Sequence, residues 1–214
     1  MGSLDIPVLL EGVSVRAGSV RILHDLVLTV VPGEAVGVFG ANGAGKTTLL
    51  RLIATLLKPS EGSVTVLGSD ATSDDRFGVR PRIGYVGHVP GLYPELTLEE
   101  NLRFVADVRG IDHGAVSSSL EAVGLLGAAR RLAERCSHGM QRRTEFARVL
   151  MTEPDLLLLD EPHSALDGDA VDLVEAIVDR TVSAGGAAIV VSHDQTRVSD
   201  MTTRTVEIVD GGVR

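Results

Sequence analysis

The residues with the clearest chemical use form one short loop, Gly40 to Thr48. Its sequence fits the phosphate-binding pattern G-x-x-x-x-G-K-[ST] at every fixed position. Glycines allow the backbone to turn so that successive N–H groups face a polyphosphate, and the helix that follows adds the partial positive charge of its N-terminus. We expect Lys46 to reach the outer phosphates and the Thr47 hydroxyl to bind Mg²⁺. The predicted nucleoside triphosphate site comprises Gly40, Ala41, Asn42, Gly43, Ala44, Gly45, Lys46, Thr47 and Thr48.

Two adjacent carboxylates, Asp160 and Glu161, follow the apolar run Leu156 to Leu159. Taken alone, this is an ordinary buried strand whose end meets solvent. In a parallel sheet, however, such a strand delivers its carboxyl end to the same edge as the phosphate loop. Asp160 is then placed to hold Mg²⁺, directly or through water, and Glu161 to orient and deprotonate an attacking water. Two neighbouring acids with separate tasks predict hydrolysis rather than binding alone.

Two further polar signals lie downstream of these acids. His193 comes just past another apolar strand, Ala187 to Val191. It either positions the water near the γ-phosphate or is a plain surface residue at a strand end. The segment Ser164 to Asp167 is by itself a turn that leads into a helix, with Asp167 near the helix N-terminus.

Strand and helix patterns outline an α/β core that a helical segment interrupts. Thr97 opens a capping box with Glu100, and Leu98, Leu102 and Val105 share one face of the helix that it starts. Strands are expected at 13–15, 26–31, 35–39, 63–66, 83–86, 155–159, 187–191 and 205–209, and helices at 45–57, over most of 97–151, and at 170–183. We predict one domain over 1–214, with an α/β core of 1–96 and 152–214 and a helical subdomain of 97–151.

The overall composition limits the partners and the compartment. The 214 residues carry a net charge of −9, which weighs against a nucleic-acid partner and against simple attraction to anionic lipid. The one cysteine, Cys136, excludes an intramolecular disulfide and fits a reducing compartment. No apolar run approaches the ~20 residues that span a bilayer, and the N-terminus has no signal-peptide pattern. We expect a soluble cytoplasmic protein.

The order of these motifs resembles the nucleotide-binding subunits of ABC transporters, over nearly all of the chain. Gly40 to Thr48 resembles the Walker A loop, and Leu156 to Glu161 resembles Walker B with its catalytic glutamate. Ser164 to Asp167 resembles the D-loop, and His193 the switch histidine. Cys136 to Met140, with the basic run that follows, resembles the signature LSGGQ. The resemblance implies a P-loop NTPase of the ABC type, with a mixed sheet core, an N-terminal antiparallel β part and an all-helical insertion.

The same resemblance implies a dimer. In the family, the signature helix binds the γ-phosphate of ATP held by the opposite subunit, a role that falls on Ser137 and Gly139, while Asp167 also contacts the partner. Read without that context, Ser137 is a helix cap and Gly139 a turn residue. The implied assembly is a homodimer or heterodimer of ABC ATPase subunits around two ATP and Mg²⁺. It would dock on an integral-membrane permease at the cytoplasmic face of the membrane.

Three positions depart from the family pattern. His88 stands where members usually carry the Q-loop glutamine; it either keeps the role through one hydrogen bond or is a neutral replacement. The signature keeps Ser137 and Gly139 but loses its leucine, one glycine and the terminal glutamine. Ala17 replaces the aromatic residue that often stacks on adenine, which leaves both ATP and GTP open as the nucleotide.

The short chain, His88 and the run Gln141 to Arg143 resemble the haem-exporter ATPase of cytochrome c maturation, although other small exporter ATPases share this build. A non-transport ABC ATPase usually has two cassettes or long coiled-coil insertions, and this sequence has neither. A small GTPase would carry an N-K-x-D motif, which is absent. The sequence therefore predicts an ATP-hydrolysing subunit that drives export through a separate permease.

Overall fold

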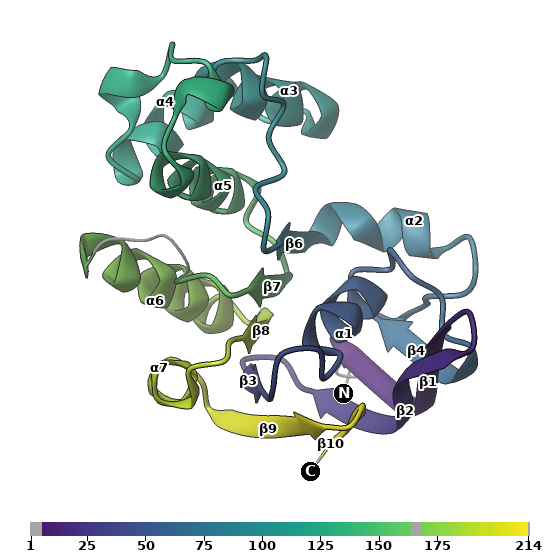
Figure 1. Cartoon of the computed structure of the whole chain (residues 1–214). Helices are drawn as coiled ribbons and strands as arrows, with labels where there is room; N and C mark the ends of the chain where they lie inside the picture. The colour runs from purple at the N-terminus through teal and green to yellow at the C-terminus, as the bar shows by residue number, and fades with distance from the viewer. Residues whose placement is uncertain (1–5, 164–167, 214) are drawn as a thin grey trace. The chain divides into compact units, whose positions relative to one another are not determined.

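The computed structural model describes residues 6–163 and 168–213, which fall into two compact units. The first unit comprises Met1–Tyr85, Pro154–Pro162 and Val178–Arg214, and the second comprises Val86–Glu153 and His163–Ile177. Figure 1 follows the chain through both of them. In the described residues, no helix is both long enough and apolar enough to cross a membrane.

An antiparallel sheet forms the N-terminal part of the first unit. Its strand order is β2-β1-β4-β5, and every pairing in it is antiparallel. The four strands are β1 (Val8–Ala17), β2 (Val20–Val30), β4 (Glu61–Val66) and β5 (Ser69–Asp70). Val8 and Leu10 of β1 face Val30 and Leu28 of β2, and all four side chains are buried. These cross-strand pairs give the sheet one apolar face.

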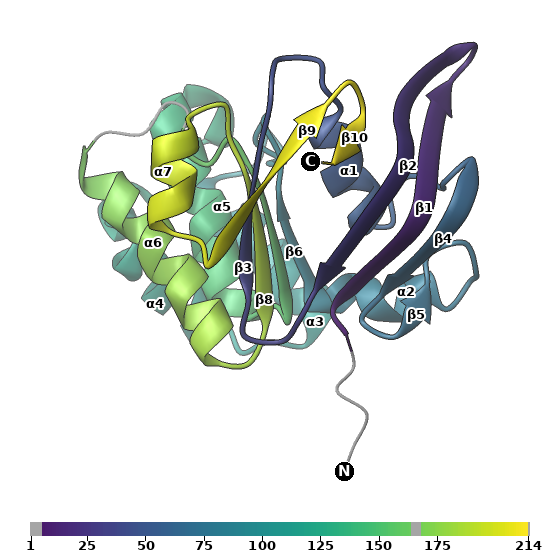
Figure 2. The ribbon, with the colours of Figure 1, turned by 90° about the horizontal axis from the view of Figure 1, so that it is seen from below.

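A second, six-stranded sheet has the order β10-β9-β3-β8-β7-β6. Its strands are β3 (Ala35–Phe39), β6 (Ile83–Val86), β7 (Leu156–Asp160), β8 (Ala187–Val191), β9 (Arg204–Val209) and β10 (Gly212–Val213). Strands β9, β3, β8 and β7 are parallel to one another, whereas β10 turns back along β9 (Figure 2). Strands β3, β7 and β8 are almost wholly buried, largely apolar runs, as expected of strands covered on both faces, whereas β9 alternates between buried and more exposed residues. The carboxyl ends of the parallel strands meet at one edge of the sheet.

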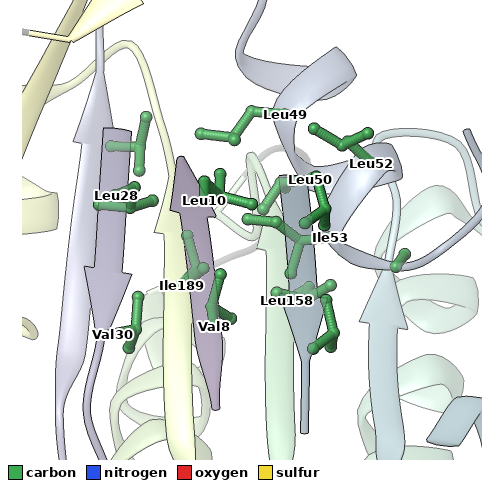
Figure 3. Close-up of a cluster of buried hydrophobic side chains, with 14 of the residues drawn as sticks. Val8, Leu10, Leu28, Val30, Leu49, Leu50, Leu52, Ile53, Leu158 and Ile189 are labelled. Atoms are coloured by element: carbon green, nitrogen blue, oxygen red, sulfur yellow. The ribbon is translucent and has the colours of Figure 1, made fainter. Parts of the chain in front are cut away.

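Helix α1 (Lys46–Ile53) packs its apolar side chains into the core of the first unit. Leu49, Leu50, Leu52 and Ile53 are fully buried. Figure 3 shows them close to side chains of β1, β2, β7 and β8. Burying a leucine or isoleucine stabilises the fold by about 1.5–3 kcal/mol, so this face fixes the helix and the loop before it. The other helices of this unit are short: α2 (Arg76–Val79), α7 (Gln195–Asp200) and a 3₁₀ turn at Arg80–Arg82.

Helices make up the second unit. The Thr97 hydroxyl accepts a hydrogen bond from the Glu100 N–H, and the Glu100 carboxylate accepts one from the Thr97 N–H at 2.8 Å. This confirms the predicted capping box. The helices are α3 (Leu98–Arg109), α4 (Gly114–Ala122) and α5 (His138–Thr152), with 3₁₀ turns at Leu126–Ala128 and Ala133–Arg135; α6 (Gly168–Ser183) begins in this unit and ends in the first.

Candidate nucleotide-binding and hydrolysis site

Glycines at both ends of the phosphate loop let it pass close to its neighbours. Gly40 has φ 151° and Gly45 has φ 106°, a region that favours glycine. A Cβ atom at Gly40 would lie 2.4 Å from the Ile208 carbonyl oxygen, and one at Gly45 would lie 2.6 Å from a Leu23 methyl group. Any larger residue at either position would displace the loop that joins β3 to α1.

The Lys46 ammonium group lies inside this loop. Lys46 is only 8% exposed, and its Nζ donates hydrogen bonds to the carbonyl oxygens of Gly40 at 2.7 Å and Ala41 at 3.0 Å. An ammonium group has three donors, so it can bind an anion at the same place. Ala41 and Asn42 on the rim of the loop are exposed. The loop thus combines an accessible backbone with a fixed positive charge.

The structure brings together the two predicted metal ligands, which are far apart in the sequence. The Thr47 hydroxyl donates a hydrogen bond of 2.8 Å to Asp160 Oδ2, and Asp160 is 1% exposed. Adjacent ligands in an octahedral Mg²⁺ site lie about 2.9 Å apart, because each sits about 2.1 Å from the ion at right angles. Two oxygen ligands at this spacing fit Mg²⁺, with its other positions open to water and phosphate oxygens.

Glu161 lies directly beyond the end of β7. Its φ of 51° is unusual for a residue with a side chain, and its N–H donates to the Val191 carbonyl oxygen at 2.9 Å. One carboxylate oxygen, Oε2, accepts a 3.0 Å hydrogen bond from the Ser192 hydroxyl and lies 2.9 Å from His193 Nδ1. Both contacts use the same oxygen. The carboxylate is therefore held through one of its two oxygens.

Ser192, which contacts the Glu161 carboxylate, was not among the site residues predicted from the sequence. It is 3% exposed and lies between the end of β8 and His193. Its position in the sequence could have predicted this contact. Because β7 and β8 are parallel neighbours, the residue after β8 lies beside the residue after β7. A hydroxyl at that place meets the carboxylate of Glu161.

The remaining predicted residues belong to the second unit or lie outside the described residues. Ser137 is the N-cap of α5, and its hydroxyl oxygen accepts from the Met140 N–H at 3.2 Å. The cap uses a lone pair, so the hydroxyl hydrogen remains a donor for an anion at the helix start. Gly139 lies in the first turn of α5, and His88 is exposed. Asp167 falls outside the described residues.

Cys136, next to the helix cap, is a poor candidate for a nucleophile. Burial raises the pKa of its thiol, and the nearby Arg131 opposes that rise only in part. Its sulfur lies 3.3 Å from the Leu132 carbonyl oxygen, to which the S–H donates. A raised pKa disfavours the thiolate, which is the form that acts as nucleophile and metal ligand. Ser137 and the backbone remain the predicted anion donors at this helix start.

A family model described as ABC transporter matches residues 23–164. The chain belongs to the ABC transporter family. It is an ATP-binding cassette, and like the other ATP-binding subunits of this family it is an ATPase that binds ATP. The family match rules out an unrelated P-loop enzyme such as a small GTPase.

Curated relatives of this cassette differ in their transport roles. The cytochrome c biogenesis ATP-binding export protein CcmA of Methylococcus capsulatus is 38% identical over 191 residues, which cover 88% of this chain and 92% of the relative. The aliphatic sulfonates import ATP-binding protein SsuB 2 of Burkholderia cenocepacia is 42% identical over 178 residues, which cover 83% of this chain and 64% of the relative.

Solved structures confirm the predicted fold class. The ATP-binding subunit of an ABC transporter has a TM-score of 0.88 at 26% identity, covering 96% of this chain and 87% of that chain. A dimeric ATP-binding cassette in a post-hydrolysis state, bound to ADP and phosphate, has a TM-score of 0.85 at 28% identity, covering 97% and 96%. The mixed core sheet and the antiparallel N-terminal sheet are those of an ABC cassette.

Proposed function

We propose that this chain hydrolyses ATP with Glu161 as the general base, as one subunit of a dimer that drives export for cytochrome c biogenesis. The observation that carries the hydrolysis is the arrangement at the sheet edge. Thr47 and Asp160 are 2.8 Å apart, and the carboxylate that follows is held by Ser192 and His193. Two oxygen atoms at the spacing of Mg²⁺ ligands, next to a carboxylate with a fixed oxygen, support this proposal.

Each residue has a separate task in the proposed reaction. Lys46 and the backbone of the phosphate loop bind the β- and γ-phosphates, with Thr48 at the helix start. Thr47 and Asp160 would hold Mg²⁺, which neutralises charge on the phosphates. Glu161 accepts a proton from the attacking water. His193 keeps the Glu161 carboxylate oriented and lies at the same edge of the sheet, where it positions the water.

The second unit would complete the site of a partner subunit. Ser137 and Gly139 at the start of α5 would bind the γ-phosphate of ATP held by the other chain, while Asp167 would contact the partner. His88 would contact the water or the metal shell in place of a glutamine. The dimeric relative bound to ADP and phosphate supports this assembly.

Replacing Glu161 tests the proposed chemistry. Glu161→Gln keeps the size and the contact with the Ser192 hydroxyl but removes the base, so we expect ATP binding to persist and turnover to fall about 10²- to 10⁴-fold. Steady-state phosphate release and a nucleotide titration measure the two effects. Glu61→Gln, an exposed glutamate on β4, is the matched control. Turnover that survives the first substitution would remove Glu161 as the base.

The proposed cargo follows from the curated relatives. Cytochrome c biogenesis ATP-binding export proteins CcmA from three organisms are 38%, 39% and 37% identical to this chain over 191, 197 and 189 residues. The partner would be an integral-membrane permease. Large apolar side chains exposed on the second unit support a protein partner there; they are Val89, Tyr93, Phe104 and Val108.

Deleting the gene separates the two transport roles. If the chain serves cytochrome c biogenesis, haem-stained c-type cytochromes disappear from the deletion strain and return with the wild-type gene. Loss of growth on an alkanesulfonate as the sulfur source, with normal cytochromes, would instead favour import. A plasmid that carries the Glu161→Gln variant tests whether complementation of the deletion strain requires ATP hydrolysis.

A further inference from the structure

The loop from Gly87 to Gly91 is held by two buried side chains of helix α5. Arg142 donates from Nη1 to the Gly87 carbonyl oxygen at 2.6 Å and from Nη2 to the His88 carbonyl oxygen at 2.8 Å. Glu145 Oε1 accepts from the Gly91 N–H at 3.0 Å. Glu145 Oε2 accepts from Arg142 Nη1, also at 3.0 Å. Both ends of the loop are thus bound to one ion pair.

Core packing alone does not require charges at this place. Arg142 and Glu145 are each 2% exposed, and burial raises the pKa of Glu145 although the Gly91 N–H, Arg142 and Arg148 all favour its charged form. Apolar residues of similar volume usually replace such a pair without loss of stability. What the ion pair adds is geometry, because the planar guanidinium group fixes two successive carbonyl groups at once.

We propose that Arg142 and Glu145 are positioning residues whose ion pair fixes the Gly87–Gly91 loop to α5, so that His88 and the start of α5 move as one body. This inference rests on the proposed function, since it takes His88 and Ser137 as residues of the ATP site. Ser137 caps the same helix little more than one turn before Arg142. A shift of the helix start on contact with a phosphate therefore carries the loop with it.

A second buried contact supports the rest of the connection to α3. Asn101 is 4% exposed; its Oδ1 accepts from the Tyr93 N–H at 2.7 Å, and its Nδ2 donates to the carbonyl oxygens of Tyr93 at 3.0 Å and Thr97 at 2.9 Å. The segment after Gly91 is thereby tied to α3. By contrast, the Gly87–Gly91 loop, which carries His88, is held by the ion pair of α5.

The test replaces both members of the Arg142–Glu145 pair, so that neither charge is left behind by the loss of the other. Arg148, whose Nη2 lies 3.9 Å from Glu145 Oε1, also loses that ion pair but is 28% exposed. In the full-length chain, Arg142→Met/Glu145→Leu is expected to keep the melting temperature near that of wild type. The Gly91 amide hydrogen should exchange about tenfold faster, as expected when a hydrogen bond to a charged acceptor is lost. Turnover of ATP should fall about 10- to 100-fold through misplacement of His88, with the Kd for ATP unchanged. Hydrogen exchange by NMR, phosphate release and nucleotide titration provide these readouts.

The matched control removes a partly exposed ion pair of the same residue types from the same unit. Arg103 and Glu99 on α3 are 2.6 Å apart, and Arg103→Met/Glu99→Leu should leave Gly91 exchange and turnover unchanged. A folded double variant at 142 and 145 with wild-type Gly91 protection or wild-type turnover would overturn the proposal. Absence of ATP turnover in the wild-type chain would instead contradict the proposed function. If the double variant unfolds, Arg142→Lys, which keeps the charge but not the fork, must show the same loss of turnover.

Discussion

At the scale of single residues, the backbone of Glu161 is the least ordinary feature of the site. A left-handed φ costs a residue with a side chain about 1–3 kcal/mol and persists only where the surroundings enforce it. Here the parallel pairing of β7 with β8 and the N–H bond to Val191 enforce it. In this conformation, Ser192 and His193 both contact one oxygen of the Glu161 carboxylate.

Ser192 is predicted to be a positioning residue for this base. Ser192→Ala removes the hydroxyl that donates to Glu161 Oε2, so the carboxylate is held by His193 alone. We expect turnover to fall about tenfold, the kinetic equivalent of one hydrogen bond to a charged group. The Kd for ATP should not change, because Lys46 and the phosphate loop are untouched. Steady-state hydrolysis and nucleotide titration measure the two quantities.

Two further variants separate this role from a structural one. Ser192→Thr keeps the hydroxyl and should retain most of the activity. In a Glu161→Gln background, Ser192→Ala should cause no additional loss. An additive loss would show that Ser192 acts elsewhere, for instance through the Asp194 N–H that donates to its hydroxyl at 3.1 Å.

At the scale of secondary structure, the strands of the parallel core were predicted well, the two long N-terminal strands were predicted only in part, as 13–15 and 26–31, and short elements were missed. The strands predicted at 83–86 and 187–191 match β6 and β8. Helix α1 ends at Ile53 rather than at 57, because Thr55 adopts a left-handed φ of 59° despite the leucines that follow. Strands β5 and β10 and helices α2 and α7 were not predicted. Such elements depend on tertiary contacts, as in the bond from the His24 N–H of β2 to the Gly211 carbonyl oxygen next to β10.

The residues of the candidate site also divide into those that local sequence patterns predict and those that depend on tertiary contacts. The phosphate loop and the two acids at the end of β7 form local patterns, which the sequence alone reveals. The contacts of Ser192 depend on which strands are neighbours. The contacts of Arg142 and Glu145 depend on which face of α5 is buried. From the sequence alone, we interpreted Arg142 only as part of the basic run that follows the signature. Long-range geometry of this kind leaves no local signal.

The N-terminal cap of helix α3 is predicted to stabilise the fold. Thr97→Ala removes both hydrogen bonds of the hydroxyl and should lower the free energy of unfolding by about 1 kcal/mol, measured by denaturant titration. Hydrogen bonds from the Thr97 N–H and hydroxyl lower the pKa of Glu100. The stability linked to Glu100 is therefore present above its unfolded pKa and is lost as the pH falls through its lowered folded pKa.

The difference between wild type and Thr97→Ala should therefore shrink at acidic pH. Ser118→Ala is the control, because this exposed hydroxyl lies within α4 and caps no helix. It should change stability by less than about 0.5 kcal/mol at every pH. If Thr97→Ala also lowered the free energy of unfolding by less than about 0.5 kcal/mol, the assigned role of the capping box would be contradicted.

At the scale of the whole molecule, the proposed ATP site needs two chains. Lys46 and Glu161 lie in the first unit, while the anion donors Ser137 and Gly139 lie at the start of α5 in the second. In the proposed dimer, the phosphate loop of one chain pairs with the α5 start of the other. A symmetric pair then contains two such sites.

Mixing two inactive variants tests this sharing directly. Lys46→Ala removes the phosphate ligand of a chain's own loop, and Ser137→Arg blocks the helix start that it offers to its partner; the exposed position of Ser137 tolerates the larger side chain. Each variant alone should be inactive. A mixture should recover about a quarter of wild-type turnover, because half of the randomly formed dimers contain one intact site of two. A mixture that stays inactive, although analytical ultracentrifugation with ATP shows dimers, would mean that each site is built within one chain.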